Sequence, residues 1–134
     1  MSFGRQFAIL MSVAEIAIIP SSASGQDWDH AQRIDVELSN FDFTPNRLTL
    51  RHGQPYRLHL TNKGSGGHNF SAPAFFNAAT VAPQDAATVA EGAIELGKGE
   101  SRDIRLVPAM GRYKLKCTHF MHSGFGMKGE IVVE

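Results

Sequence analysis

Apolar and polar residues alternate along most of the chain after Gln26. A period of two places every second side chain on the same face, so it predicts β-strands with one face in a core and the other in water. The clearest case is residues 56–61, where Tyr56, Leu58 and Leu60 alternate with polar residues. Seven segments have this pattern, at residues 34–38, 48–50, 56–60, 94–96, 104–106, 113–115 and 131–133.

Short segments rich in glycine, proline and asparagine separate these strands. Seven short strands with turn signals between them predict an all-β fold in which two sheets pack as a β-sandwich. The alternation stops between Ala72 and Gly92, an alanine-rich stretch with prolines at positions 73 and 83. We therefore expect a short helical or loop insertion around residues 73–92, on the outside of the sandwich.

The N-terminal segment has the pattern of a secretory signal peptide. Arg5 precedes an apolar run from Phe7 to Ile19, and small residues follow this run up to Gly25. The run is shorter than the roughly 20 residues that a membrane-spanning helix needs. We predict a signal peptide at residues 1–25, one domain at residues 26–134, export to the periplasm, and no membrane span in the mature form.

The composition of the chain argues against a nucleic-acid partner and against metal sites built from several cysteines. Thirteen Lys and Arg balance thirteen Asp and Glu, and the basic residues are spread along the chain among the acidic ones. A nucleic-acid-binding domain would concentrate its basic residues, so we expect no nucleic-acid partner, and we expect a monomer. The single cysteine, Cys117, excludes an intramolecular disulfide and any four-thiolate zinc or iron-sulfur site.

Possible metal ligands gather near the end of the chain. Cys117 shares the inward face of its strand with Tyr113 and Leu115, so we expect the thiol to point into the sandwich. Two imidazoles and two thioethers follow it, in His119, Met121, His122 and Met127. Thiolate, imidazole and thioether suit copper, and a blue-copper electron-transfer site consists of two histidines, one cysteine and a weak axial methionine. The candidate for the upstream histidine is His68, in the glycine-rich loop at residues 66–70.

At these two segments the sequence resembles the cupredoxins, and within them the azurins. The resemblance covers essentially the whole mature domain, with Gly-His-Asn-Phe at residues 67–70 upstream and Cys-Thr, His-Ser and Met-Lys-Gly within residues 117–129 downstream. It implies a Greek-key β-sandwich with one type 1 copper. The ligands that it implies are His68, Cys117, His122 and Met127.

The resemblance also implies roles for residues around the ligands. The carbonyl of Gly67 would approach the copper, and Asn69 would tie the two ligand loops together, as outer-shell hydrogen bonds commonly do. The spacing from Cys117 to His122 is azurin-like, whereas the spacing from His122 to Met127 is similar to that of plastocyanin.

Two ligand assignments stay open at this point. If the strand continued past Cys117, His119 would share its inward face, so His119 is the alternative to His122. Met121 is the alternative thioether to Met127.

The sequence thus predicts a one-electron carrier and not an enzyme. A copper-delivery or copper-resistance protein is the alternative, suggested by the additional His119 and Met121. Because the chain is neutral, we expect little long-range steering toward redox partners. We expect docking through a weak apolar patch formed by Phe120, Met121 and Phe125.

Overall fold

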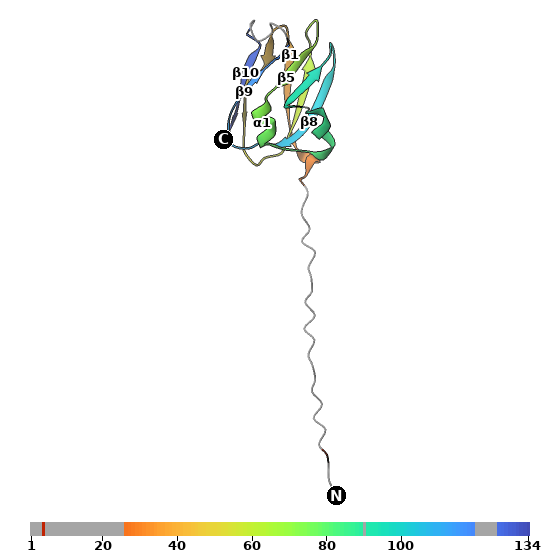
Figure 1. Cartoon of the computed structure of the whole chain (residues 1–134), viewed down its shortest axis with the longest axis vertical. Coiled ribbons are helices and arrows are strands. Elements are labelled where there is room, and N and C mark those ends of the chain that lie inside the picture. The colour runs from red at the N-terminus through yellow and green to blue at the C-terminus, as the bar shows by residue number, and fades with distance from the viewer. Residues whose placement is uncertain (1–3, 5–25, 90, 120–125) are drawn as a thin grey trace.

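Two β-sheets pack face to face in the computed structural model, which describes residues 4, 26–89, 91–119 and 126–134 (Figure 1). The first sheet has the strand order β2 (Asp42–Thr44), β1 (Gln32–Ser39), β4 (Tyr56–Asn62), β8 (Ser101–Val107) and β6 (Thr80–Val81). The second has the order β3 (Arg47–Leu50), β10 (Lys128–Val133), β9 (Gly111–Lys116), β5 (His68–Ser71) and β7 (Ala93–Leu96). The predicted all-β sandwich is confirmed.

The core lies between the sheets and consists of the apolar residues that the alternating pattern placed inward. In β4 the buried residues Tyr56, Leu58 and Leu60 alternate with half-buried polar ones. The other sheet supplies Leu48, Leu50, Phe70, Ile94, Leu96, Leu115, Ile131 and Val133. The period-two segments therefore fold as strands because alternation lets each strand bury one face and hydrate the other.

The insertion at residues 73–92 contains a helix, a short strand and a 3-10 helix. The helix α1 (Pro73–Ala78) begins with proline at its first position, where the missing N–H costs no hydrogen bond. Phe75 and Phe76 on α1 are buried, and Phe75 packs edge-on against Tyr113 of β9. The insertion thus closes part of the core as well as covering the sandwich.

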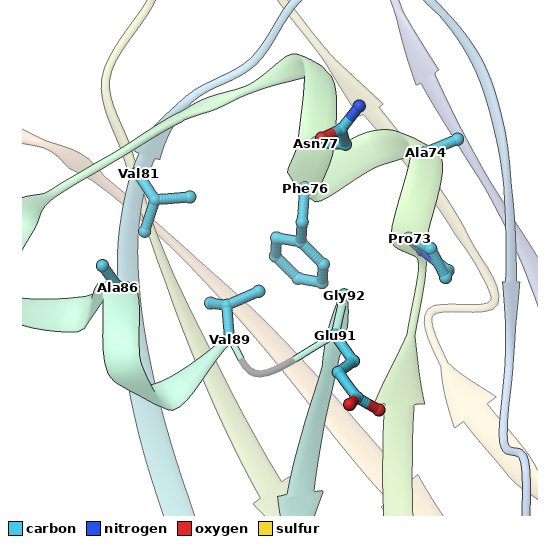
Figure 2. A pocket seen from close by; sticks show the side chains of 9 residues that line it. All are labelled: Pro73, Ala74, Phe76, Asn77, Val81, Ala86, Val89, Glu91 and Gly92. Carbon is cyan, nitrogen blue, oxygen red and sulfur yellow. The ribbon is translucent and has the colours of Figure 1, made fainter.

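An apolar pocket lies between α1 and the second 3-10 helix, η2 (Pro83–Thr88), as Figure 2 shows. Phe76, Val81 and Val89 point into it, and Glu91 lies at its rim. The first 3-10 helix, η1 (Trp28–His30), precedes β1. No helix in the described ranges is long and apolar enough to span a membrane.

Three of the ten strands among the described residues were not predicted. These are β2, β5 and β6, and the error that matters is β5, because the sequence predicted a loop at residues 66–70. All four residues of β5 are buried. A strand that is buried on both faces shows no alternation, so its period-two signal is missing.

Candidate metal centre

His68 opens β5 directly after a tight turn that Asn62 organises. Asn62 is buried, and its side-chain amide donates to the carbonyls of Gly66, Leu96 and Gly97 at 2.8 to 3.2 Å. Its side-chain oxygen accepts a hydrogen bond from the backbone N–H of Gly64 at 2.9 Å. One side chain therefore joins the 64–67 turn, which leads into β5, to the turn after β7.

Cys117 follows the last residue of β9 and is fully buried, as the inward phase of that strand predicted. Its backbone N–H donates to the carbonyl of Met127 at 3.1 Å, so the pairing of β9 with β10 continues past the ends of both strands. Met127 is also fully buried. The backbone thus brings the predicted thiolate and the predicted axial residue side by side at one end of the sandwich.

The imidazole of His68 faces the thiol of Cys117. The distance from Nδ1 to Sγ is 3.9 Å, and both residues are at most 1% exposed. Metal-donor bonds of about 2.0 to 2.3 Å, as zinc makes to nitrogen and sulfur, would let both atoms reach a single ion. This buried pair fits a soft or borderline metal such as copper.

Asn40 holds the other nitrogen of the His68 ring. Nε2 of His68 lies 2.9 Å from Oδ1 of Asn40, which also accepts a hydrogen bond from the backbone N–H of Ser65. Because this oxygen can only accept, Nε2 is the protonated nitrogen and the lone pair of Nδ1 faces Cys117. A Cβ on Gly64 would overlap both side chains, so this position requires glycine.

Asn69 fastens the segment after Cys117 to β5. Its side-chain oxygen accepts a hydrogen bond from the backbone N–H of Thr118 at 2.8 Å, and its amide donates to the hydroxyl of Thr118 at 2.6 Å. The backbone N–H of Asn69 also points at Sγ of Cys117, at 3.5 Å. The structure therefore places Asn69 where a residue joining the two ligand segments must lie.

Glu95 extends this network from the edge strand β7. It lies directly opposite Asn69 in the β5–β7 register. One carboxylate oxygen accepts a hydrogen bond from the Asn69 amide at 2.7 Å, and the other lies 2.8 Å from Nε2 of His119. Glu95 thus contacts the segment after Cys117 twice, directly through His119 and indirectly through Asn69.

These contacts also change the acidity of Glu95. Partial burial raises the pKa of this carboxyl, but the hydrogen bonds from Asn69 and His119 and the attraction to His119 outweigh it. The pKa of Glu95 is therefore lowered overall, and the carboxylate form is favoured.

His119 does not continue the inward face of β9. The strand ends at Lys116, and the His119 side chain is 32% exposed and directed toward Glu95. Its ring stacks alongside that of His68 with centroids 6.5 Å apart, and a Cβ on Gly67 would lie 3.2 Å from its Cε1. His119 would share the inward face only if the strand continued past Cys117, and β9 ends before that point, so this condition is not met.

The structure brings together His68, Gly67, Asn69, Cys117 and Met127 of the predicted site. The predicted ligand His122 and the alternative Met121 lie outside the described residues. Within the described ranges no group of three or more His, Cys, Asp or Glu side chains could hold a metal ion.

A surface pocket reaches the His68 side of this centre. Its lining comes from the β1–β2 connection, the glycine turn and the two histidines, namely Asn40, Phe41, Ser65, Gly66, Gly67, His68 and His119. Phe41 packs edge-on against His68 and is 37% exposed. Among the described residues, this pocket therefore lies between the buried imidazole of His68 and the surface.

The sequence reasoning missed Asn40, Asn62 and Glu95. Asn62 stands at the end of a predicted strand and before a glycine-rich turn, which is a signal for a turn-organising side chain. Asn40 and Glu95 carry no such signal, since each acts on a residue more than twenty positions away.

Fold and site together define a class of protein, a β-sandwich that gathers soft metal donors at one end. The chain matches the family model of the cupredoxin-like domain over residues 8–133, and it belongs to that family. No curated protein matches the chain.

Two solved structures show the likeness of fold. One is a dithionite-reduced auracyanin from the photosynthetic bacterium Roseiflexus castenholzii, with 23% identity, a TM-score of 0.57, and coverage of 78% of this chain and 98% of that one. The other is auracyanin B, with 25% identity, a TM-score of 0.56, and coverage of 78% and 89%. Family membership supports copper binding and electron transfer as the general function of the chain.

Proposed function

We propose that this chain holds one type 1 copper through His68, Cys117, His122 and Met127 and acts as a periplasmic one-electron carrier. The observation that carries the proposal is the buried pair of His68 Nδ1 and Cys117 Sγ, 3.9 Å apart. When bound, copper supplies a couple that takes up and releases single electrons.

The residues around this pair keep the donors in place. Asn40 orients the His68 ring, and the backbone N–H of Asn69 donates to the Cys117 sulfur. Cys117 is held against Met127 by a backbone hydrogen bond. Donors that are fixed by packing and hydrogen bonds reorganise little when the charge of the site changes, and this favours fast electron exchange.

The second histidine ligand in this proposal is His122. His119 is engaged with Glu95, which favours His122 as the ligand. The same contact weakens the case for a copper-delivery protein, because His119 has a structural partner in this fold.

Four ligands from the protein would leave no open position for a substrate, in contrast to catalytic metal sites. We therefore propose a carrier and not an enzyme. We also propose that the protein acts as a monomer without nucleic-acid partners, and that Phe120, Met121 and Phe125 form an apolar docking patch. These three residues lie outside the described residues.

Export is part of the proposal and has its own test. We expect the protein isolated from the periplasmic fraction to begin at Gln26, as N-terminal sequencing would show. A mature protein that retains residues 1–25 would contradict the predicted signal peptide.

The test of the copper site is spectroscopic. Copper(II) added to the purified mature protein should produce an intense band at about 600 nm from the copper-thiolate bond. Cys117→Ser removes the thiolate and should abolish the band even if copper still binds. A Cys117→Ser protein with an unchanged band would refute the assignment.

Two further variants decide between the histidines. His122→Gly should lose the band and recover it with added imidazole, whereas His119→Gly should keep the band. The reverse result would make His119 the ligand.

A further inference from the structure

The outer face of the second sheet concentrates positive charge in a chain that is neutral overall. Strands β3, β10 and β9 are adjacent, and their outward positions carry five basic residues, namely Arg47, Arg112, Lys114, Lys116 and Lys128. We refer to this surface as the basic face. The carboxylate on these three strands is Glu130, which lies 3.1 Å from Arg112 and 3.8 Å from Arg47.

Among the three lysines of the basic face, Lys114 lies opposite Glu130 in the β9–β10 register, whereas Lys116 and Lys128 face no carboxylate across these two strands. Lys114, Lys116 and Lys128 are exposed, and none of them forms an ion pair with any residue that the structure describes. Neutrality in the sequence predicted weak steering of partners. That prediction rests on the average charge of the chain, whereas the fold gathers basic residues that are mixed with acidic ones along the sequence onto one face.

Two of these lysines lie directly opposite each other. Lys116 of β9 and Lys128 of β10 are register partners in the antiparallel pair. Like charges in this arrangement destabilise a sheet. An anionic group of a partner that contacts both lysines would compensate this repulsion.

The lysine pair also adjoins the metal centre in sequence and in space. Lys116 directly precedes Cys117, Lys128 directly follows Met127, and the backbone N–H of Cys117 donates to the carbonyl of Met127. An anionic surface that contacts both lysines would therefore lie beside the ligand end of the sandwich.

We propose that the basic face, centred on Lys116 and Lys128, docks the acidic surface of a redox partner protein. That the partner is a redox protein follows from the proposed electron-transfer function, on which this inference rests. Opposite charges on two such surfaces increase the rate at which the two proteins associate, and added salt reduces this increase.

The first test uses the metal-free protein, so that it does not depend on copper chemistry. Poly-L-glutamate titrated into the ¹⁵N-labelled mature protein at low ionic strength should shift amide signals of β9 and β10 and leave those of β1 and β4 unchanged. Lys116→Gln/Lys128→Gln should weaken this binding about tenfold. The matched control is Lys63→Gln/Lys98→Gln, which removes the same net charge from exposed turn residues and should weaken binding less than twofold.

The second test uses electron transfer with small oxidants. Oxidation of the copper-loaded, reduced protein by hexacyanoferrate(III) should slow about threefold to tenfold in Lys116→Gln/Lys128→Gln and should slow with added salt in the wild type. Oxidation by a cationic cobalt complex should not slow in the same variant.

Three outcomes would overturn the proposal. One is an equal loss of poly-L-glutamate binding in the control variant, and another is no binding at low ionic strength. The third is tighter binding to phosphatidylglycerol vesicles than to poly-L-glutamate, which would assign the face to a membrane.

The Tm of Lys116→Gln/Lys128→Gln should equal or exceed that of the wild type, and a lower Tm would refute the like-charge argument. A protein that binds poly-L-glutamate at the basic face but forms no band at about 600 nm would fail only the copper proposal.

Discussion

Glu95 gives the sharpest test of how the segment after Cys117 is held in place. Glu95→Ala removes two hydrogen bonds, one to the buried amide of Asn69 and one to the imidazole of His119. A hydrogen bond to a charged group contributes about 1.5 to 3 kcal/mol. The Glu95 side chain is 65% exposed, so water replaces part of what is lost, and we expect the free energy of unfolding to fall by about 1 to 2 kcal/mol.

Variants of neighbouring groups separate the two bonds. His119→Ala removes the hydrogen bond of Glu95 to His119, together with the stacking of His119 on His68, and leaves the bond to Asn69 in place. For such an exposed contact the expected cost is less than about 0.5 kcal/mol. Glu95→Gln retains an amide oxygen that can accept from Asn69 and should lie between wild type and Glu95→Ala. The matched control is Glu37→Ala, the same truncation at an exposed position of β1 on the other sheet, with an expected cost of less than about 0.5 kcal/mol.

The assay is urea unfolding of the metal-free mature protein, followed by circular dichroism, so that metal affinity does not enter. In a separate thermal unfolding experiment, the Tm of Glu95→Ala should be lower than that of the wild type by about 5 to 10 °C for a domain of this size. If His119→Ala cost as much as Glu95→Ala, the contact with Asn69 would not be the important one. Glu95→Ala that unfolds like the wild type would refute the reasoning altogether.

The remaining predictions concern pH, the outer shell and the core. The folded pKa of Glu95 is lowered from 4.5, so the Glu95 carboxylate stabilises the folded protein above that pH, and this contribution is lost as the pH falls through the folded pKa. The difference in the free energy of unfolding between wild type and Glu95→Gln should therefore shrink from pH 7 toward pH 3. Asn40→Ala removes the partner of His68 Nε2 and should weaken copper binding about 10- to 100-fold in a chelator competition, whereas Asn77→Ala on the exposed side of α1 should not change it. Phe75→Ala truncates a fully buried ring and should cost about 3 to 5 kcal/mol in urea unfolding, whereas Met110→Ala at a 64% exposed side chain should cost less than about 0.5 kcal/mol. A small loss for Phe75→Ala would mean that α1 is not part of the cooperative core.

The sequence by itself determined the strands that have one wet face. In β1, β4 and β8 each alternating apolar residue is an independent local signal, and the burial observed in β4 repeats that alternation. The inward phase of Cys117 was determined in the same way, because Tyr113 and Leu115 specify the face that it shares.

Only the tertiary structure decided how the site is supported. β5 carries no period-two signal because both of its faces are buried, and the strand exists through its pairing with β7 and β9. Asn40 and Glu95 lie in other strands or turns from the residues that they hold, and no local pattern relates them.

The distribution of charge was decided at the same level. Lys116 and Lys128 are twelve positions apart in the sequence, and only the register of β9 against β10 sets them opposite each other. A local pattern specifies which way a side chain points from its own strand. Strand pairing specifies what that side chain meets, since hydrogen bonds and charge interactions act across distances of a few ångströms that only the folded chain establishes.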